Sequence, residues 1–308
     1  MLKIENLAKS YGKFKAVNHL SLEIKEGEIF GFVGPNGAGK TTTMKMIATL
    51  LKPDSGKIYL DGVDLSKDLK GIRERIGYMP DFFGVYDNLK ASEYLEFYGD
   101  VAGLSKDEIK NTIDDLLTLV DLTHKREAYV DSLSRGMKQR LCLARSLIHN
   151  PKLLILDEPA SGMDPRARVQ MKEILKELKR MGKTILISSH ILSELAELCD
   201  SIGIIENGEI VQIGSVDQIM RKVSNRNLIK IKVLEHIERA VTLLKEEPLI
   251  NEVFTDENYI EISFEGEEKD LTKIIKKLIS NDLWVTSFSP IERNLEEIFM
   301  KVTKGEEE

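Results

Sequence analysis

The stretch GPNGAGKTT, residues 34 to 42, decides how this chain folds. It satisfies the pattern G-x-x-x-x-G-K-S/T between IFGFVG, an apolar run typical of a buried strand, and TTTMKMIATLLKP, a run with helical spacing. Gly34, Gly37 and Gly39 let the backbone turn tightly with its N–H groups pointing inward, and the following helix adds the positive end of its dipole. The sequence therefore predicts a phosphate-binding loop between a strand and a helix that stops at Pro53.

The residue types in this loop indicate which part of a nucleotide it binds. The Lys40 ammonium would reach the β- and γ-phosphates, and the Thr41 hydroxyl would hold Mg²⁺. The loop residues that we assign to the nucleotide are Gly34, Asn36, Gly37, Ala38, Gly39, Lys40, Thr41 and Thr42.

Two further apolar runs end in polar side chains. KLLILDEP places Asp157 and Glu158 at the end of one buried strand, and KTILISSH places His190 at the end of another. Strands alternate with helices here, which predicts an α/β fold with a parallel sheet whose ligands sit at the carboxyl ends of the strands. We expect Asp157 to hold the water shell of magnesium, Glu158 to polarise an attacking water, and His190 to contact the γ-phosphate.

Hydrophobic spacing predicts further elements around these runs. Strands are expected in MLKIENLAKSY, VNHLSLEI and RERIGYMP, a hairpin in DSGKIYLDGVDL, and helices from there to about residue 150 and in RVQMKEILKELKRMG. ENGEIVQIGS reads as a closing hairpin with Asn207 and Gly208 as its turn.

The pattern changes beyond Arg221. Strand, helix, strand, strand, helix, strand and helix follow in NLIKIKVL, IERAVTLLKEE, INEVF, YIEISF, EKDLTKIIKKLIS, LWVTSFS and LEEIFMKVT, an order that resembles a split βαβ, ferredoxin-like unit. This part of the sequence carries no phosphate loop, metal-ligand cluster or nucleophile constellation. We therefore expect two domains, an ATP-binding domain at 1–220 and an accessory or regulatory domain at 221–308.

Composition excludes several classes of protein. The 308 residues carry 44 basic and 51 acidic side chains, a formal charge of −7 that argues against a nucleic-acid surface. Cys142 and Cys199 have no CxxC spacing and lie in apolar helical patterns, so we interpret them as core thiols in a reducing, cytoplasmic context. Because no apolar run approaches the roughly 18 residues of a spanning helix, any link to a membrane is expected to run through a partner.

The stretch LSRGMKQRL, residues 133 to 141, predicts a second anion site. Ser134 and Gly136 stand at the start of a helix, where a hydroxyl and backbone N–H groups can face a phosphate. One nucleotide hardly needs both this helix start and the loop at 34–42.

With GPNGAGKTT, LSRGMKQR, LLILDEP, SGMD and ISSH in this order, the chain resembles the ATP-binding subunits of ABC (ATP-binding cassette) transporters over roughly residues 1 to 215. The resemblance implies a P-loop NTPase cassette with a parallel sheet core, an antiparallel β subdomain and a helical subdomain, followed here by the small ferredoxin-like α+β domain. It implies ATP and Mg²⁺ as ligands and ATP hydrolysis as the activity. The order of cassette and small C-terminal domain is similar to subunits of bacterial ABC-2 type exporters, which favours export over import.

The resemblance also implies partners. Two cassettes, identical or different, stack head to tail, so that Ser134 and Gly136 would serve the partner's γ-phosphate and Ser161 and Asp164 would line the interface. Tyr11 would stack on adenine. An integral membrane permease would hold the subunit on the inner face of the membrane, and Phe82, Phe83 and Tyr86 are candidates for the groove that receives it.

Two motifs depart from the family pattern. LSRGM stands where LSGGQ is usual, so Arg135 replaces a glycine and Met137 a glutamine. The Arg135 guanidinium could add positive charge near the partner's nucleotide or point to solvent, and we favour solvent. Asp81 replaces a glutamine that senses magnesium and the attacking water; its carboxylate could still coordinate Mg²⁺ through water. These departures leave open a nucleotide-gated module with little turnover. A cassette that acts on ribosomes or DNA is also open, although such relatives carry two cassettes or long coiled coils, and this sequence has one cassette and no heptad run.

Overall fold

The computed structural model describes residues 1–82, 84, 86, 88–215, 218–219, 227–256, 259–266 and 268–290. The chain divides into two compact units, Met1–Val216 and Asp217–Glu308. Each unit has its own hydrophobic core and is described by itself.

The first unit begins with an antiparallel sheet whose strand order is β2-β1-β4-β5. Its strands are β1 (Leu2–Tyr11), β2 (Phe14–Ile24), β4 (Ser55–Leu60) and β5 (Val63–Asp64). Alternating burial along β1 and β2 is the pattern of strands with one face in the core. The expected strands and the hairpin at DSGKIYLDGVDL are confirmed.

A six-stranded sheet of order β10-β9-β3-β8-β7-β6 forms the centre of this unit. Its strands are β3 (Ile29–Val33), β6 (Ile76–Met79), β7 (Leu153–Asp157), β8 (Thr184–Ser189), β9 (Ser201–Glu206) and β10 (Glu209–Gly214). All pairs are parallel except that of β9 with β10, which is closed by Asn207 and Gly208 with positive φ angles, as predicted. Every residue of β3, β7 and β8 is buried. Because these three strands run parallel, their carboxyl ends meet at one edge of the sheet.

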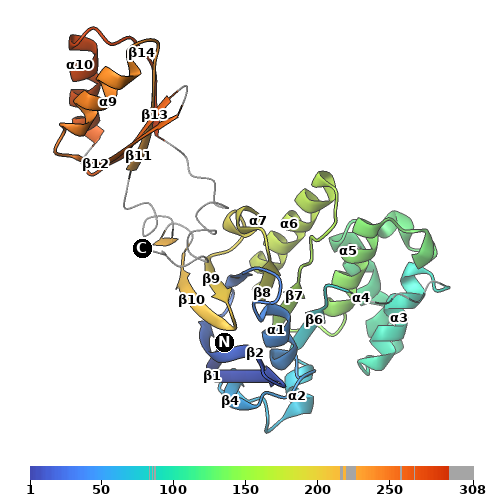
Figure 1. Cartoon of the computed structure of the whole chain (residues 1–308). Helices are drawn as coiled ribbons and strands as arrows, with labels where there is room; N and C mark the ends of the chain where they lie inside the picture. The colour runs from blue at the N-terminus through green and yellow to red at the C-terminus, as the bar shows by residue number, and fades with distance from the viewer. Residues whose placement is uncertain are drawn as a thin grey trace. The chain divides into compact units, whose positions relative to one another are not determined.

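Helices cover this sheet and extend to one side of it (Figure 1). They are α1 (Lys40–Ile47), α2 (Leu69–Arg73), α3 (Ala91–Val101), α4 (Lys106–Leu119), α5 (Arg135–Leu147), α6 (Pro165–Arg180) and α7 (Leu192–Ala196). Two short 3₁₀ turns, Thr123–Lys125 and Val130–Ser132, connect α4 to α5. The packed helices α3, α4 and α5 form the expected helical block.

The first helix is shorter than the sequence predicts. We expected α1 to continue to Pro53, but it ends at Ile47. The N–H of Thr49 donates to the carbonyl of Met46, the N–H of Leu50 donates to that of Lys45, and Thr49 has φ 59°. This is a Schellman closure, which satisfies the last carbonyls of the helix before the proline is reached.

The second unit is an antiparallel sheet of order β12-β13-β11-β14 with two helices on one face (Figure 1). Its elements are β11 (Asn227–Val233), α9 (Ile237–Lys245), β12 (Ile250–Asp256), β13 (Tyr259–Phe264), α10 (Glu268–Ser280) and β14 (Val285–Pro290). This order and connectivity confirm the ferredoxin-like expectation. The helix expected in LEEIFMKVT lies outside the described residues.

The two cysteines are free thiols within the packed structure, as the sequence predicts. Cys142 is buried and Cys199 half-buried, and both are free. Burial raises the pKa of the Cys142 thiol to about 11 and raises that of Cys199 further, so both stay protonated at neutral pH.

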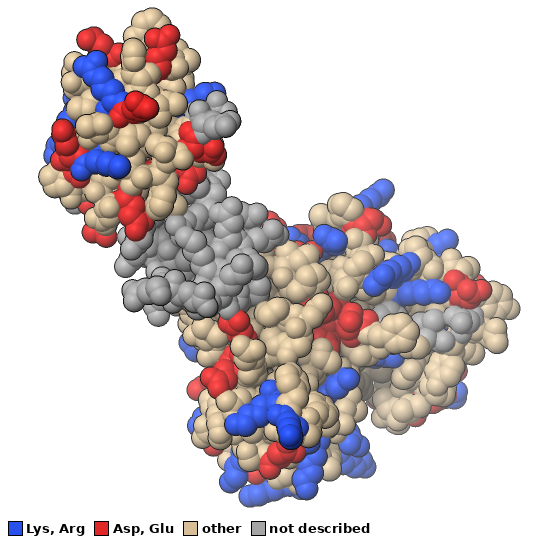
Figure 2. Space-filling model, viewed as in Figure 1, with Lys and Arg blue, Asp and Glu red and all other residues tan. Residues whose placement is uncertain are grey.

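Basic and acidic side chains are interspersed over the visible face of the first unit (Figure 2). No described helix combines the length and apolarity needed to cross a bilayer.

Candidate active site

A cavity of about 330 Å³ lies over the loop at 34–42. Residues that the sequence assigned to the nucleotide or to the interface and that line this cavity are Tyr11, Asn36, Gly37, Ala38, Gly39, Lys40, Thr41, Thr42, Asp81, Glu158, Ser161 and His190. Gly39 caps α1 with φ 107°, and a Cβ there would collide with the carbonyl oxygen of Ala16. Only glycine therefore fits this point of the loop.

The Lys40 side chain is buried against the loop backbone. Its ammonium donates to the carbonyls of Gly34 and Pro35 and lies 3.9 Å from Glu158 Oε1. Burial lowers the pKa of Lys40, and the nearby carboxylates of Glu158 and Asp157 oppose that shift. The cation is thus held at the cavity by carbonyls that a phosphate oxygen can replace.

The register between β7 and β8 places the Ser188 hydroxyl where it contacts both Asp157 and Glu158. Asp157 lies opposite Ser188, whose hydroxyl donates to Asp157 Oδ1 at 2.7 Å and accepts from the Glu158 N–H at 3.0 Å. Ser188 is fully buried. The sequence analysis missed this serine, because it could not tell which residue of β8 faces Asp157.

Glu158 is held in an unusual backbone conformation at the end of β7. Its φ is 50°, in the left-handed region that costs a non-glycine residue free energy. Its Oε2 lies 2.9 Å from Nδ1 of His190, which comes from the end of β8. Burial raises the pKa of Glu158, while the His190 hydrogen bond and Lys40 lower it. The carboxylate is therefore poised at the cavity with a basicity above its ordinary value.

Asp157 offers an oxygen that suits a metal-bound water. Its side chain is buried, and its Oδ2 has no hydrogen-bond partner among the described residues. Within the described part of the chain, no group of three or more His, Cys, Asp or Glu side chains could hold a metal by itself. Thr41 lines the cavity, and Asp157 precedes the lining residue Glu158 in the chain. The Asp157 carboxylate and the Thr41 hydroxyl, completed by phosphate oxygens and waters, fit the way that Mg²⁺ binds with nucleotides.

Two exposed aromatic side chains stand at the mouth of the cavity. Tyr11 and Phe14 are 53% and 59% exposed, and they face each other across the turn between β1 and β2. The sequence analysis named Tyr11 and missed Phe14. The signal was present, because an aromatic residue three positions beyond Tyr11 returns to the same end of a tight hairpin.

The helix start that the sequence predicts as a second anion site does not line this cavity. Ser134 caps α5, accepting from the Met137 N–H at 3.3 Å, and it is exposed. Neither Ser134 nor Gly136 lines the cavity over the P-loop. These two residues are thus free of any contact with the nucleotide cavity of their own chain.

The SGMD segment contacts α5 within the chain. Gln139 donates to the Ser161 carbonyl at 2.9 Å, and Asp164 caps α6 by accepting from the Ala167 N–H at 2.9 Å. Arg135 is exposed, but its guanidinium occupies the space that a side chain at Gly162 would take. Arg135 is thus exposed as we expected, but its guanidinium lies against Gly162 of the SGMD segment and does not extend freely into solvent.

The region expected to receive a permease contains exposed aromatic rings. Phe82 is 91% exposed, and Tyr86 packs edge to face on Phe97. Phe83 lies outside the described residues. A separate cavity of about 730 Å³ lies nearby between α2, the end of α3 and α5, and includes Tyr98 in its lining.

Comparison with known proteins gives two family matches. Residues 17–161 match the model of the ABC transporter family, and residues 214–303 match that of the ATP-binding protein DrrA1-3-like, C-terminal domain. The first match lies within the first unit, and the second covers most of the second unit.

Full-length relatives agree with these matches. The chain is 35% identical to the linearmycin resistance ATP-binding protein LnrL of Bacillus subtilis (strain 168), covering 98% of each protein. It is 38% identical to the bacitracin transport ATP-binding protein BcrA of Bacillus licheniformis, covering 99% of this chain and 98% of BcrA.

Solved structures resemble the first unit. An ATP-binding subunit of an ABC transporter matches with a TM-score of 0.66 and 31% identity, over 73% of this chain and 93% of that one. A dimeric ATP-binding cassette in a post-hydrolysis state, bound to ADP and Pi, matches with a TM-score of 0.65 and 27% identity, over 70% and 99%.

Proposed function

The chain belongs to the ATP-binding proteins of ABC transporters, which hydrolyse ATP, and from this premise we propose that Mg·ATP binds in the cavity over its P-loop. One observation carries the proposal: Lys40, Glu158 and His190 reach this single cavity from α1, β7 and β8. Phosphate oxygens would replace the carbonyl partners of Lys40, and Tyr11 would stack on the adenine.

We assign the activation of the attacking water to Glu158. Its carboxylate, made more basic by burial, would accept a hydrogen bond from the attacking water and polarise it. His190 contacts the same carboxylate at 2.9 Å and would orient it while its ring faces the γ-phosphate. Asp157, through a water, and the Thr41 hydroxyl would hold Mg²⁺, with Asp81 also lining the cavity. The bound ion would supply positive charge that stabilises the phosphates.

We further propose that two cassettes close head to tail over two nucleotides. The cavity of one chain contains no contribution from its own Ser134 or Gly136, although both stand at a helix start able to bind an anion. A neighbouring chain would supply them, and Ser161, which lines the cavity, would then lie at the interface with Asp164. The similarity to a dimeric cassette bound to ADP and Pi supports this arrangement. The partner is a second copy of this chain or a different cassette.

The closing and reopening of the dimer would drive a membrane permease. Differential binding of ATP and ADP to the closed state supplies the energy. Relatives named for linearmycin resistance and bacitracin transport favour export, with the chain held on the inner face of the membrane by the permease. We propose that residues 1–220 form the ATP-binding domain, that 221–308 form an accessory domain, and that Phe82 and Tyr86 contact the permease. A role on ribosomes or DNA is not favoured, since these full-length relatives are transport and resistance proteins.

Substitution of Glu158 tests the proposal. Glu158→Gln keeps the size of the side chain and removes its basicity, so steady-state ATPase activity should fall at least a hundredfold while ATP still binds. Glu177→Gln on α6 is the control, since the half-buried Glu177 pairs with Arg180 and does not line the nucleotide cavity. Equal turnover in the Glu158→Gln and unsubstituted proteins would favour a nucleotide-gated module over an ATPase that drives transport.

A further inference from the structure

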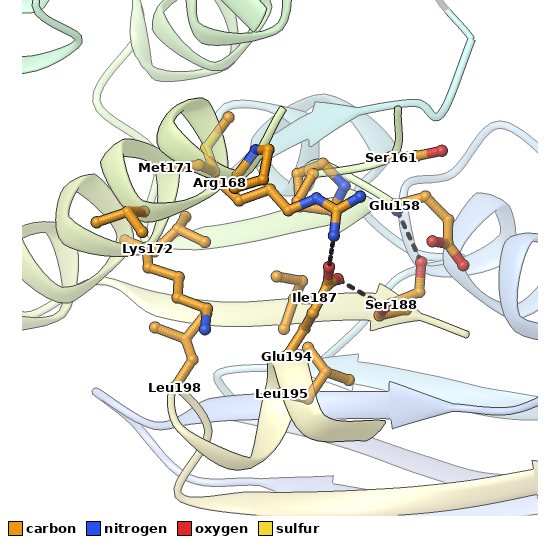
Figure 3. A pocket seen from close by; sticks show the side chains of 16 residues that line it. Glu158, Ser161, Arg168, Met171, Lys172, Ile187, Ser188, Glu194, Leu195 and Leu198 are labelled. Atoms are coloured by element: carbon orange, nitrogen blue, oxygen red, sulfur yellow. Dashed lines mark hydrogen bonds and ion pairs between the residues drawn. The ribbon is translucent and has the colours of Figure 1, made fainter. Parts of the chain in front are cut away.

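A second cavity, of about 220 Å³, lies behind the hydrolysis residues between α6, β8 and α7 (Figure 3). Its inner wall is apolar and buried, with Met171, Leu175 and Leu195 each 1% exposed. Two charged side chains, Arg168 from α6 and Glu194 from α7, point toward one another at this cavity (Figure 3). Neither has a part in the proposed chemistry.

Arg168 joins α7 to the SGMD segment. Its Nη1 lies 3.2 Å from Glu194 Oε1, and its Nε donates to the backbone carbonyl of Met163 at 3.1 Å. Met163 is buried, and Ser161 of the same segment lines the nucleotide cavity. Any displacement of this segment therefore pulls on the Arg168 guanidinium.

Glu194 also contacts the residues on both sides of His190, directly through the Ser189 hydroxyl and, through that hydroxyl, at the Ile191 N–H. Its Oε2 accepts from the Ser189 hydroxyl at 3.3 Å, and that hydroxyl accepts from the Ile191 N–H at 3.0 Å. Because a hydroxyl has one proton, donation to Glu194 leaves its lone pairs for the Ile191 N–H. The carboxylate thereby fixes the turn from which the His190 ring reaches Glu158.

We infer that Arg168 and Glu194 are positioning residues that set the place of His190 according to the position of the SGMD segment. The inference rests on the proposed role of His190 in hydrolysis. Arg168 is 39% exposed and Glu194 only 19%, so losing one partner of this half-buried ion pair lowers folding stability. A purely structural pair therefore predicts easier unfolding but almost no change in the kcat of the folded protein. A positioning pair predicts a loss, because small misplacements of a reacting group are costly.

The chain offers a matched control on the same two elements. Lys172 of α6 lies 2.8 Å from Glu197, which caps the end of α7. This pair also joins the two helices, and Lys172 lines the same cavity. The Lys172 ammonium bonds to Glu197, away from the contacts that Arg168 and Glu194 make with Met163 and Ser189. Lys172→Met and Arg168→Met remove one cation each and keep a similar apolar stem.

The experiment measures kcat and KM for ATP in the full chain at one protein concentration. Arg168→Met and Glu194→Gln should each lower kcat about tenfold and leave KM within about twofold, since the P-loop and Tyr11 are untouched. The double variant should lose no more than a single one, because both act through one network. Lys172→Met should stay within about twofold of the unsubstituted protein.

Three results would overturn the inference: unchanged kcat in both variants, an equal loss in Lys172→Met, or losses that multiply in the double variant. His190→Ala, measured alongside, distinguishes a failure of the positioning role from a failure of the proposed role of His190. If His190→Ala loses turnover while Glu194→Gln does not, the positioning role alone fails. If His190→Ala keeps full turnover, the proposed role of His190 fails and the inference with it.

Discussion

Replacing Ser188 by alanine should destabilise the first unit more than any ordinary loss of a serine hydroxyl. The Ser188 hydroxyl is buried, and it serves two partners at once. It donates to the Asp157 carboxylate and accepts from the Glu158 N–H, at the point where Glu158 adopts a positive φ. Ser188→Ala removes both hydrogen bonds and leaves the N–H of Glu158 without its side-chain acceptor.

The size of the effect follows from these two bonds. A hydrogen bond to a charged group contributes about 1.5 to 3 kcal/mol, and leaving a buried donor unsatisfied costs about 1 to 3 kcal/mol. Taking the lower part of both ranges, because alanine leaves room for water, we expect a loss of about 3 kcal/mol. For a unit of this size that loss lowers the melting temperature by about 6 to 12 °C.

Thermal unfolding followed by circular dichroism, with Ser146→Ala as the control, measures this difference. Ser146 is also buried, but its hydroxyl donates only to the neutral Leu143 carbonyl at 2.7 Å, so its loss should cost about 1 kcal/mol. Equal shifts in melting temperature for Ser188→Ala and Ser146→Ala would refute the reasoning. ATPase activity of Ser188→Ala should also fall, since the Glu158 backbone loses its anchor.

Three other substitutions test the site. The raised pKa of Glu158 means that the unfolded chain releases this proton at lower pH than the folded chain; ionisation therefore costs stability as pH rises above about 4.5. In urea unfolding, Glu158→Gln should accordingly be more stable than the unsubstituted protein at pH 8 and equal to it at pH 4, and the opposite trend would contradict burial as the dominant cause. Asp81→Ala should lower Mg²⁺-dependent hydrolysis about tenfold with little change in ATP affinity by equilibrium binding, and unchanged steady-state activity would count against a magnesium role. Ser134→Ala should lower turnover at least tenfold and leave ATP binding to the monomer intact, whereas weakened binding by the monomer would place Ser134 in the nucleotide cavity of its own chain.

Much of the fold could be predicted because the decisive signals are local. A glycine-rich loop between a buried strand and a helix is written in consecutive residues, and the loop at 34–42 forms that arrangement. Acidic and histidine side chains at the ends of buried strands had to meet at one edge of a parallel sheet, and Glu158 and His190 do meet there. The ferredoxin-like order of the second unit followed from hydrophobic periodicity in the same way.

Three other features were not predicted from the sequence, each for a different reason. The end of α1 was placed too late because proline was taken as the stop, whereas backbone hydrogen bonds around Thr49 close the helix earlier. Phe14 was missed although its spacing from Tyr11 is a local signal, because the tight turn between β1 and β2 that brings both residues to the cavity was not considered. Arg135 was expected in solvent, and its contact with Gly162 exists because α5 packs beside the SGMD segment.

The amino-acid sequence by itself determined which chemistry this protein carries, because backbone phosphate binding needs glycines at set spacings and the reacting side chains must end buried strands. Tertiary structure alone decided how those side chains are held. Ser188 reaches Asp157 because strand register places them opposite each other. Arg168 reaches both Met163 and Glu194 because the fold brings α7 within reach of a long side chain on α6, across the cavity that both helices line. Register and packing are properties of the whole core, since every strand and helix must bury its apolar face at once.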